Sequence, residues 1–238
     1  MTGVSIIIPT LNEAENVRIL LGDLARLQTH LQKGHTAFEV VVVDGGSRDA
    51  TCEIAAQHGA RVLTSPPTRG GQLRAGYLAS QGKLLWLLHA DSRVGPEVWD
   101  ALVALIGERV WGRFDVQLGD APVPFGFRVL SWTMNLRSRL TCIATGDQGI
   151  FVERTLLVEA GGVPNQPLME DIALSLRLRR LRPPVCLSER LQTSRRKWQR
   201  DGFVRGTLRI FRTRLAYAWG ASPALLAKRY YREGEVRQ

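Results

Sequence analysis

Short continuous apolar runs separated by helical patterns dominate the first 120 residues of the chain. The strand-like runs cover residues 4–9, 38–44, 61–64 and 84–89, and the helical patterns cover residues 13–27, 49–58, 71–80 and 96–108. Continuous apolar strands that alternate with helices are typical of a parallel sheet covered on both faces. Because crossovers between parallel strands are right-handed, we expect an α/β fold with a doubly wound, mostly parallel sheet.

The pattern becomes less regular after residue 112. Residues 114–119 alternate with period two and predict a half-exposed strand, while residues 149–152 predict a buried one. Helical spacing covers residues 125–140 and 171–180, and Pro183 and Pro184 end the second of these helices. The sequence shows no repeat and no low-complexity linker, which favours one large domain with an appendage.

The basic residues are concentrated at the end of the chain. Residues 1–176 contain 15 Lys and Arg against 18 Asp and Glu, whereas residues 177–238 contain 17 against 4. The formal net charge of +10 therefore comes from the last quarter of the sequence. Such a surface favours partners that carry phosphate, whether nucleic acid, lipid headgroups or a nucleotide.

A helical pattern over residues 203–217 carries much of this charge. It places Val204, Leu208, Phe211 and Leu215 on one stripe, and arginines flank that stripe. The stripe can pack on the preceding domain with the arginines in water, or it can lie on an anionic membrane. The sequence leaves both interpretations open.

Several protein classes are excluded by composition. With 45% apolar residues in 238, the chain can bury a large core and is not a disordered polymer. No apolar stretch reaches the ~18–20 residues of a spanning helix, and the first residues lack the charged start and cleavage site of a signal peptide. The cysteines, Cys52, Cys142 and Cys186, match no zinc or disulfide spacing. We therefore expect a cytoplasmic protein.

Polar residues follow three of the predicted strands, at the edge where ligands bind in a doubly wound sheet. They lie at residues 9–13, 44–47 and 89–92. Asp44 and Asp91 end long apolar runs, and such carboxylates can accept hydrogen bonds from a base or ribose, or hold a hard divalent cation. A single polar strand end of this kind is also typical of a turn or a helix cap. Three such strand ends together favour a binding site.

Five ordered motifs resemble those of family 2 glycosyltransferases. They are SIIIPTLNEAEN (5–16), VVVDGGSRDAT (41–51), RGGQLRAG (69–76), LLWLLHADS (84–92), in the place of the DxD motif, and MEDIALS (169–175), which resembles the catalytic ED motif. The resemblance spans about residues 4–200 and is strongest to a compact bacterial subgroup without transmembrane segments. It implies a GT-A nucleotide-sugar fold, with a glycosyltransferase domain over residues 1–200. Residues 201–238 would form a basic, amphipathic helical extension packed on that domain or on a membrane.

The resemblance also implies a metal-dependent, inverting transfer of a sugar from a UDP-sugar to a hydroxyl or carboxyl acceptor. Asp44 would accept a hydrogen bond from uracil N3–H, and Arg69 would face the diphosphate or the base. Asp91 would bind Mn²⁺ or Mg²⁺ that bridges the diphosphate. The full set of implied nucleotide-sugar contacts is Pro9, Thr10, Asn12, Glu13, Asp44, Arg69, Ala90, Asp91, Arg195, Arg196 and Trp198.

Asp171 would be the general base that takes the proton of the acceptor hydroxyl. Glu170 would support it by shaping the field or by binding the acceptor. Asp147 and Gln148 lie in a segment that faces the acceptor in relatives, although a simple turn explains them equally well. In the basic run 193–200, an arginine would hold phosphate and Trp198 would stack on a sugar or seal the cleft.

One residue departs from the family pattern, because His89 replaces the first aspartate of DxD. A neutral imidazole can ligate a metal or bond to ribose, but it adds no negative charge. We therefore expect a metal site weaker than one with two carboxylates. The alternative is a histidine that packs at the strand end and donates to a backbone carbonyl.

Other functions fit the sequence less well. A sugar-phosphate nucleotidyltransferase would share the fold, but the glycine-rich loop typical of those enzymes is missing after the first strand. A nucleic-acid-binding protein would use the basic tail, but no zinc-finger, RNP-like or helix-turn-helix pattern supports it, and we expect no nucleic-acid partner. Related bacterial enzymes glycosylate carotenoid acids, which suggests a lipid or isoprenoid acceptor and peripheral contact with the inner face of the cell membrane through the last helix.

Overall fold

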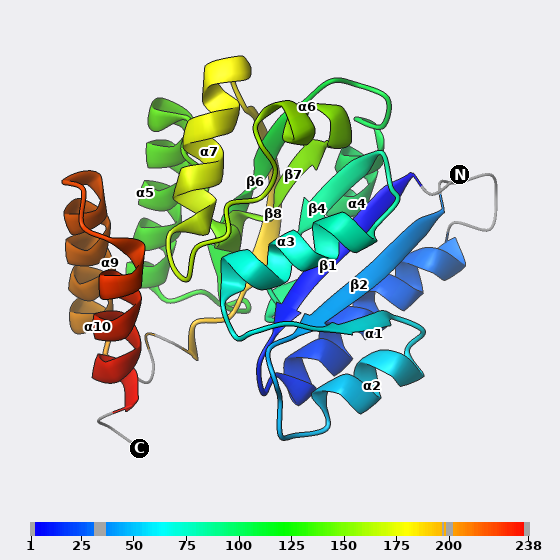
Figure 1. The fold of residues 1–238 in the computed structure, drawn as a ribbon, viewed down its shortest axis with the longest axis horizontal. Helices are drawn as coiled ribbons and strands as arrows, with labels where there is room; N and C mark the ends of the chain where they lie inside the picture. Colours follow the sequence, from blue (N-terminus) through cyan, green and yellow to red (C-terminus); the bar gives the residue numbers. More distant parts are fainter. Residues whose placement is uncertain (1–2, 31–36, 197, 199–201, 236–238) are drawn as a thin grey trace.

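The computed structural model describes residues 3–30, 37–196, 198 and 202–235. Within these residues the chain forms one eight-stranded sheet in the order β3-β2-β1-β4-β7-β6-β8-β5. The strands are β1 Val4–Thr10, β2 Phe38–Asp44, β3 Arg61–Thr64, β4 Leu84–Leu87, β5 Ser92–Arg93, β6 Trp111–Leu118, β7 Ile150–Glu153 and β8 Val185–Thr193. The helices around them are drawn in Figure 1.

The sheet has a parallel half and a mixed half. Strands β3, β2, β1 and β4 are parallel neighbours, whereas β7 runs antiparallel to both β4 and β6. Strand β8 is parallel to β6, and β5 is antiparallel to β8. The predicted α/β architecture with a mostly parallel sheet is therefore confirmed, and the carboxyl ends of β1, β2 and β4 meet at one edge.

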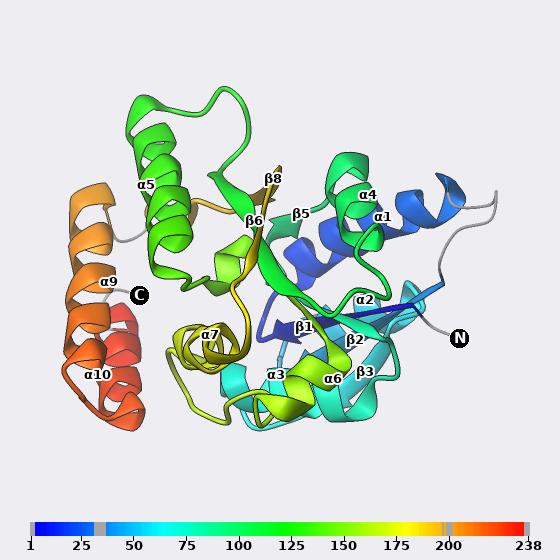
Figure 2. The same ribbon diagram turned by 90° about the horizontal axis from the view of Figure 1, so that it is seen from above.

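Helices cover both faces of the sheet (Figure 2). Helices α1 (Ala14–His30), α2 (Thr51–Gln57) and α4 (Pro96–Val103) pack on one face, and α3 (Arg69–Ala79), α6 (Arg154–Glu159) and α7 (Glu170–Leu181) pack on the other. Neighbouring residues of a strand point to opposite faces. In β1, Ile6 and Ile8 accordingly join the first core cluster, and Ile7 joins the second.

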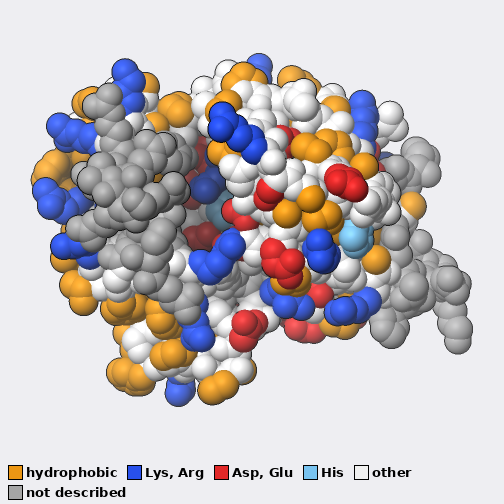
Figure 3. All heavy atoms as spheres, turned by 90° about the horizontal axis from the view of Figure 1, so that it is seen from below, with side chains coloured by type: hydrophobic (Ala, Val, Ile, Leu, Met, Phe, Trp, Pro, Cys, Tyr) orange, Lys and Arg blue, Asp and Glu red, His pale blue; other side chains and the backbone are white. Residues whose placement is uncertain are grey.

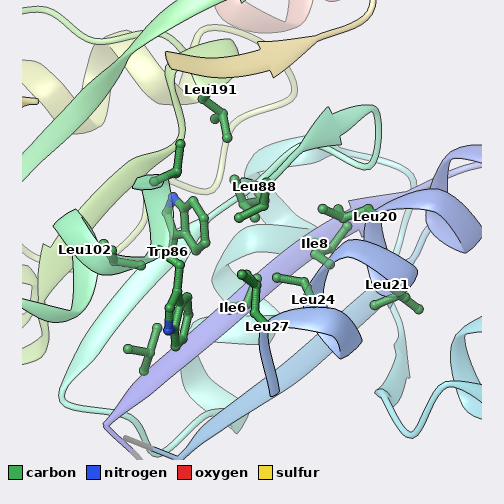
Figure 4. Packing of buried hydrophobic residues seen from close by; sticks show 14 of the residues in the cluster. Ile6, Ile8, Leu20, Leu21, Leu24, Leu27, Trp86, Leu88, Leu102 and Leu191 are labelled. Carbon is green, nitrogen blue, oxygen red and sulfur yellow. The ribbon is translucent and has the colours of Figure 1, made fainter. Parts of the chain in front are cut away.

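The first core cluster is built around Trp86 of β4 (Figure 4). Its indole lies 6.5 Å from the Trp99 ring and 5.6 Å from the Phe114 ring, and its Nε1 donates to the Gly149 carbonyl at 3.2 Å. Full burial of each such side chain contributes roughly 1.5–3 kcal/mol, or more for the larger rings. The packed core thus holds in place the strands whose carboxyl ends carry the polar loops.

Three further helices lie beyond the β6 side of the sheet: α5 (Phe125–Thr141), α9 (Phe203–Ala218) and α10 (Pro223–Glu235). Phe127, Leu130 and Met134 of α5 pack with Val116 and Leu118 of β6, and Ile210 of α9 joins this cluster. Leu226 and Ala227 of α10 pack with Leu168. Among the described residues, no helix is both long and apolar enough to cross a membrane.

The largest difference from the sequence prediction is β8, which was not predicted. The burial of this strand is mostly partial, and Glu189 and Arg190 interrupt its apolar pattern. It is defined by pairing with β6, with a shift of register after Phe114, and not by its own hydrophobicity. Elsewhere, β4 ends at Leu87, so that His89 lies outside the sheet in the following turn.

Candidate functional site

The loops after β1 and β2 are joined by reciprocal hydrogen bonds. The Asn12 amide donates to Ser47 Oγ at 2.8 Å, and the Arg48 amide donates to Asn12 Oδ1 at 2.8 Å. Asn12 has a φ of 53°, a left-handed conformation that asparagine tolerates better than most residues. The two strand ends therefore form a single surface.

The buried Asp44 carboxylate holds these two loops together by accepting hydrogen bonds from both. Its carboxylate is 2% exposed and accepts from Thr10 Oγ1 at 3.0 Å, from the Gly46 amide at 2.8 Å and from the Ser47 amide at 2.7 Å. Burial by itself would raise the pKa of Asp44, but these bonds and that of the Ser47 hydroxyl outweigh it and lower the pKa. Asp44 is thus a fixed, ionised acceptor, and a ligand N–H that reached it would replace one of these donors.

Asp91 lies on the turn after β4 and is partly buried. Thr193 Oγ1, at the end of β8, is 3.4 Å from its Oδ1. Burial raises the pKa of Asp91, and the Asp147 and Glu13 carboxylates raise it further, against the opposing effect of His89 and Arg196. The raised pKa means that the ionised form of Asp91 is poorly solvated, so a cation bound at this carboxylate would stabilise its charge.

Arg196, in the late arginine-rich run, reaches this edge of the sheet. Arg196 Nη2 donates to Glu13 Oε2 at 3.1 Å, which links the segment after β8 to the loop after β1. Residues 197, 199 and 200 of this run lie outside the described residues.

His89 has a partner that neither sequence interpretation included. Its Nδ1 is 3.1 Å from Asp147 Oδ1. The other side of the ring lies against Gly146, where a Cβ atom would stand 2.2 Å from His89 Nε2. The imidazole is therefore fixed between a carboxylate and the backbone, an arrangement that orients Asp147 and the Gly146 segment.

Asp171 and Glu170 begin α7, after Met169 in a left-handed conformation with φ of 63°. Asp171 Oδ2 accepts from the Gly146 amide at 3.0 Å. Glu170 is 3% exposed and lies 3.7 Å from Arg69 Nη1. Burial raises the pKa of Glu170, because the Arg69 charge offsets only part of it and the Asp171 carboxylate adds to the rise.

These side chains line one pocket between β4 and α7. Its lining residues are Leu73, Leu87, His89, Gly146, Ile150, Val163, Glu170, Asp171 and Leu174. The apolar walls bury the Glu170 carboxyl group, which explains its raised pKa. Figure 3 shows a hollow on one face of the molecule in which acidic and basic side chains gather beside a histidine.

Some predicted ligand contacts are buried in the protein instead. Gln148 is fully buried, with its amide nitrogen 3.0 Å from Ser138 Oγ and its oxygen 3.1 Å from the Thr145 amide. Trp198 is 5% exposed and packs edge-on to Phe127 at 6.2 Å. The Ala90 methyl lies in the first core cluster. Each of these side chains has a packing role, so stacking of Trp198 on a sugar would need the cluster to open.

Arg195 differs from these residues. Its guanidinium lies over the Phe127 ring at 5.9 Å, and its Nη1 is buried with no hydrogen-bond acceptor among the described residues. Its side chain packs against Gly119, where a Cβ atom would stand 2.9 Å from Arg195 Cδ. Arg195 is therefore held away from Glu13 and Asp91, the groups that face Arg196.

Sequence reasoning missed three residues that the fold brings to this region: Thr193, Arg137 and Arg214. Thr193 approaches Asp91 only because β8 pairs with β5 and β6. Arg137 on α5 and Arg214 on α9 both interact electrostatically with Asp171. The spacing of arginines on the last helix was visible in the sequence, but nothing there distinguished the one that faces the site.

The part of the chain that the structure describes contains no group of three or more His, Cys, Asp or Glu side chains placed to hold a metal ion. Asp91 is the carboxylate that a cation would use, because its ionised form is disfavoured by burial and a bound cation would offset that cost. Mg²⁺ takes one or two protein carboxylates together with substrate phosphate oxygens and water. The residues present therefore fit a cation that is completed by a diphosphate.

Comparisons of sequence and structure relate the chain to known proteins. The family model described as Glycosyl transferase family 2 matches residues 5–124. An uncharacterised glycosyltransferase of Mycobacterium tuberculosis (strain ATCC 25618 / H37Rv) is 29% identical over 144 residues, which cover 58% of this chain and 62% of the relative. Human dolichyl-phosphate beta-glucosyltransferase is 31% identical over 98 residues, 37% of this chain and 30% of that protein. The chain thus spans less than two thirds of these relatives.

A solved structure shares the fold. Glucosyl-3-phosphoglycerate synthase from Mycobacterium tuberculosis, in complex with Mn²⁺, UDP and glucosyl-3-phosphoglycerate, superposes with a TM-score of 0.57 and 22% sequence identity. The match covers 81% of this chain and 71% of that one. The fold is the GT-A fold of nucleotide-sugar enzymes, as the sequence motifs predicted.

Proposed function

Since this chain belongs to glycosyltransferase family 2, we propose that it transfers a sugar from a UDP-sugar to an acceptor oxygen, with inversion at the anomeric carbon. The observation that carries the proposal is the joined edge of the sheet. Three aspartates from separate elements lie there: Asp44 ends β2, Asp91 lies in the turn after β4, and Asp171 lies in the first turn of α7. Hydrogen bonds hold Asp44 and Asp171 in place. In an α/β sheet this edge is where nucleotides bind.

The nucleotide would lie on the loops after β1 and β2. Pro9 and Thr10 end β1, and Asn12 and Glu13 extend the same surface. The ionised Asp44 suits the N3–H of uracil, a donor that cytosine lacks. Among these residues Glu13 also receives Arg196, so that a basic side chain lies near the place of the diphosphate.

A divalent cation, Mn²⁺ or Mg²⁺, would be held by Asp91 together with diphosphate oxygens. When bound, it supplies Lewis-acid stabilisation of the charge on the departing UDP. The chain's own contribution is the partly buried Asp91 carboxylate with Thr193 beside it. His89 is engaged by Asp147, so we assign it to orienting the Gly146 segment and not to the cation.

The transfer itself would be a single displacement. The acceptor oxygen bonds to the anomeric carbon while the bond from that carbon to the diphosphate oxygen breaks, and UDP leaves with the electron pair. Asp171 takes the acceptor proton; its Oδ2 is aligned by the Gly146 amide. Glu170, buried beside Arg69, would maintain the field around the base.

The test is the release of UDP from UDP-glucose, UDP-galactose and UDP-N-acetylglucosamine, with a polyprenyl phosphate and with a polyprenol, whose hydroxyl carries the proton that Asp171 would take, as acceptors. The relative named dolichyl-phosphate beta-glucosyltransferase motivates the phosphate acceptor. We expect one donor to be turned over, and both Asp91→Asn and Asp171→Asn to lose turnover while remaining folded. Near-normal turnover in either variant would remove that residue from its assigned role.

We further propose that the protein binds an anionic membrane peripherally, through two apolar stripes that lie on α5 and α9. The α9 stripe is exposed, with Val204 67% and Phe211 63% accessible. A second stripe on α5, at Phe125, Val129, Trp132, Leu136 and Leu140, is exposed as well. Arginines accompany both stripes, as a helix on anionic lipid requires. Figure 3 shows hydrophobic and basic side chains together on that side of the molecule.

Sedimentation with phosphatidylglycerol vesicles measures this binding. We expect the wild type to co-sediment, Trp132→Ser and Phe211→Ser to weaken binding, and Leu78→Ser on α3 to leave it unchanged. Leu78 is the matched control because it is 66% exposed but lies on a different helix. Equal binding by all four proteins would contradict the proposal.

A further inference from the structure

Two arginines from helices far apart in the sequence, Arg137 and Arg214, interact electrostatically with the proposed catalytic base. Met134 of α5 and Ile210 of α9 belong to one apolar cluster, which fixes the two helices against each other. Arg137 is three residues after Met134, and Arg214 is four residues after Ile210. Because residues three or four apart share a helix face, both arginines extend from the packed faces toward the same space.

Arg137 has unused hydrogen-bonding capacity in this space. Its Nη1 reaches the Ile143 carbonyl at 3.4 Å, whereas its Nη2 is buried without an acceptor among the described residues. Burial lowers the pKa of Arg137 to about 10, and the neighbouring Arg214 charge contributes to that decrease. A buried guanidinium N–H without a partner is unfavourable, since most buried donors are satisfied by protein, water or ligand.

Arg214 is also partly buried. Burial lowers its pKa, while the Asp171 and Asp147 carboxylates act in the opposite direction. Within the described residues neither it nor Arg137 makes an ion pair as close as 4.0 Å. Two like charges thus lie near each other and near Asp171, but neither carboxylate neutralises them by direct contact.

The position of the pair separates it from the donor site. Helices α5 and α9 stand beyond the β6 side of the sheet, whereas the loops after β1 and β2 lie on the other side of Asp171 and its helix α7 (Figures 1 and 2). Asp91, the residue assigned to the diphosphate, is influenced by Arg196 and His89. The two arginines therefore face the side from which an acceptor would approach the base.

We propose that Arg137 and Arg214 form a subsite for an oxyanion group of the acceptor, a phosphate or a carboxylate. This rests on the proposed glycosyltransferase function. Two guanidinium groups offer paired N–H donors that match the oxygens of such a group. The subsite would hold the acceptor so that its attacking oxygen lies at Asp171, and it would select against neutral acceptors. The same helices carry the exposed stripes, so a lipid headgroup and a soluble anion are the two sources of this chemistry.

The experiment measures binding of three probes by isothermal titration calorimetry: inorganic phosphate, octyl phosphate below its micelle concentration, and octanoate. Saturating UDP and Mn²⁺ fill the donor site, and NaCl keeps the ionic strength constant. The variants are Arg137→Gln and Arg214→Gln. Arg212→Gln is the matched control, because it removes the same charge from the same helix at an exposed position.

We expect at least one probe to bind the wild type and Arg212→Gln equally, with affinity at least tenfold lower in both other variants. Tighter binding of an octyl probe than of phosphate identifies a lipid source, and equal binding identifies a soluble anion. If Arg214→Gln fails to fold, Arg214→Lys retains the charge and should bind with intermediate affinity. Equal affinities in all proteins, or no binding of any probe, would overturn the subsite. Failure of the donor proposal is separate, since it appears as absence of UDP binding.

Discussion

Gly146 packs against the His89 ring in the site, and a side chain added at Gly146 would clash with that ring. In Gly146→Ala, the added Cβ atom would lie 2.2 Å from His89 Nε2 and 2.6 Å from Cε1. Ordinary contact between such atoms needs about 3.5 Å. The imidazole must therefore move by more than 1 Å or rotate, and either change breaks its contact with Asp147.

The magnitude follows from what that movement disrupts. Insertion of a methyl group into a packed site costs about 1–3 kcal/mol of folding free energy. The Gly146 amide also donates to Asp171 at 3.0 Å, so displacement of this segment misplaces the proposed base. A misplacement of about 1 Å lowers catalysis by on the order of 100-fold. We therefore predict a loss of about 1–3 kcal/mol in stability and about 100-fold in turnover.

Urea denaturation measures the stability, in the wild type, in Gly146→Ala, in His89→Ala and in the double variant. If the clash with the ring is the cause, Gly146→Ala costs much less in the His89→Ala background, with a coupling energy of roughly 0.5–3 kcal/mol. Gly22→Ala on α1 is the control, because a Cβ atom there meets nothing within 4 Å. It should be neutral or stabilise the protein by about 0.5–1 kcal/mol. If Gly146→Ala lowers the free energy of unfolding equally with and without the His89 ring, the clash with that ring is not the cause.

Three other predictions follow from burial. Asp91→Asn should lose activity, but in the absence of added cation at pH 8 the variant should be more stable than the wild type. Because the folded-state pKa of wild-type Asp91 is raised, its protonated carboxyl stabilises the fold fully below the unfolded pKa of about 3.9, and this stabilisation is lost as pH rises through the folded pKa. The difference in melting temperature between the variant and the wild type should therefore grow from pH 3.5 to 8, and a constant difference would contradict the prediction. Trp198→Ala should lose about 3–5 kcal/mol in denaturant titrations, because its indole is buried against Phe127; an unchanged midpoint with weaker donor binding would instead favour stacking on the sugar. Gln148→Ala should lose about 1–3 kcal/mol, because the buried Thr145 amide loses its acceptor and Ser138 Oγ loses the donor it accepts from; a stable variant impaired only in its KM for acceptor would restore the acceptor role.

The parallel half of the fold was predictable from local patterns alone. The apolar run at residues 38–44 became β2 with the same bounds, and helix α5 begins at the expected Phe125 and ends one residue after the predicted 140. Long apolar runs are buried on both faces of a parallel sheet, so their hydrophobicity is visible without tertiary information. Strand β8 has no such hydrophobic run, because it is formed by its pairing with β6.

The sequence allowed us to predict which strand ends carry the site residues, but not which side chains contact one another there. Asp44 and Asp91 follow strands whose ends must meet, so their common edge could be predicted. The pairing of His89 with Asp147 depends on where β7 and the segment before it return to β4. The burial of Gln148 depends on the packing of α5, and the approach of Arg214 depends on that of α9. Contacts of this kind join residues from distant parts of the chain, and no local pattern encodes them.

Calorimetric titration of UDP, with and without Mn²⁺, measures the proposed nucleotide site by itself, because it needs neither the donor sugar nor the acceptor. At about 100 times the dissociation constant, UDP with Mn²⁺ should stabilise the protein by about 2.7 kcal/mol, and a parallel thermal melt should rise by about 5–11 °C. Asp171→Asn should bind UDP as the wild type does, whereas Asp91→Asn should lose the part of the affinity that depends on Mn²⁺. Absence of UDP binding to the wild type, or the same Mn²⁺ dependence in Asp91→Asn, would contradict the account.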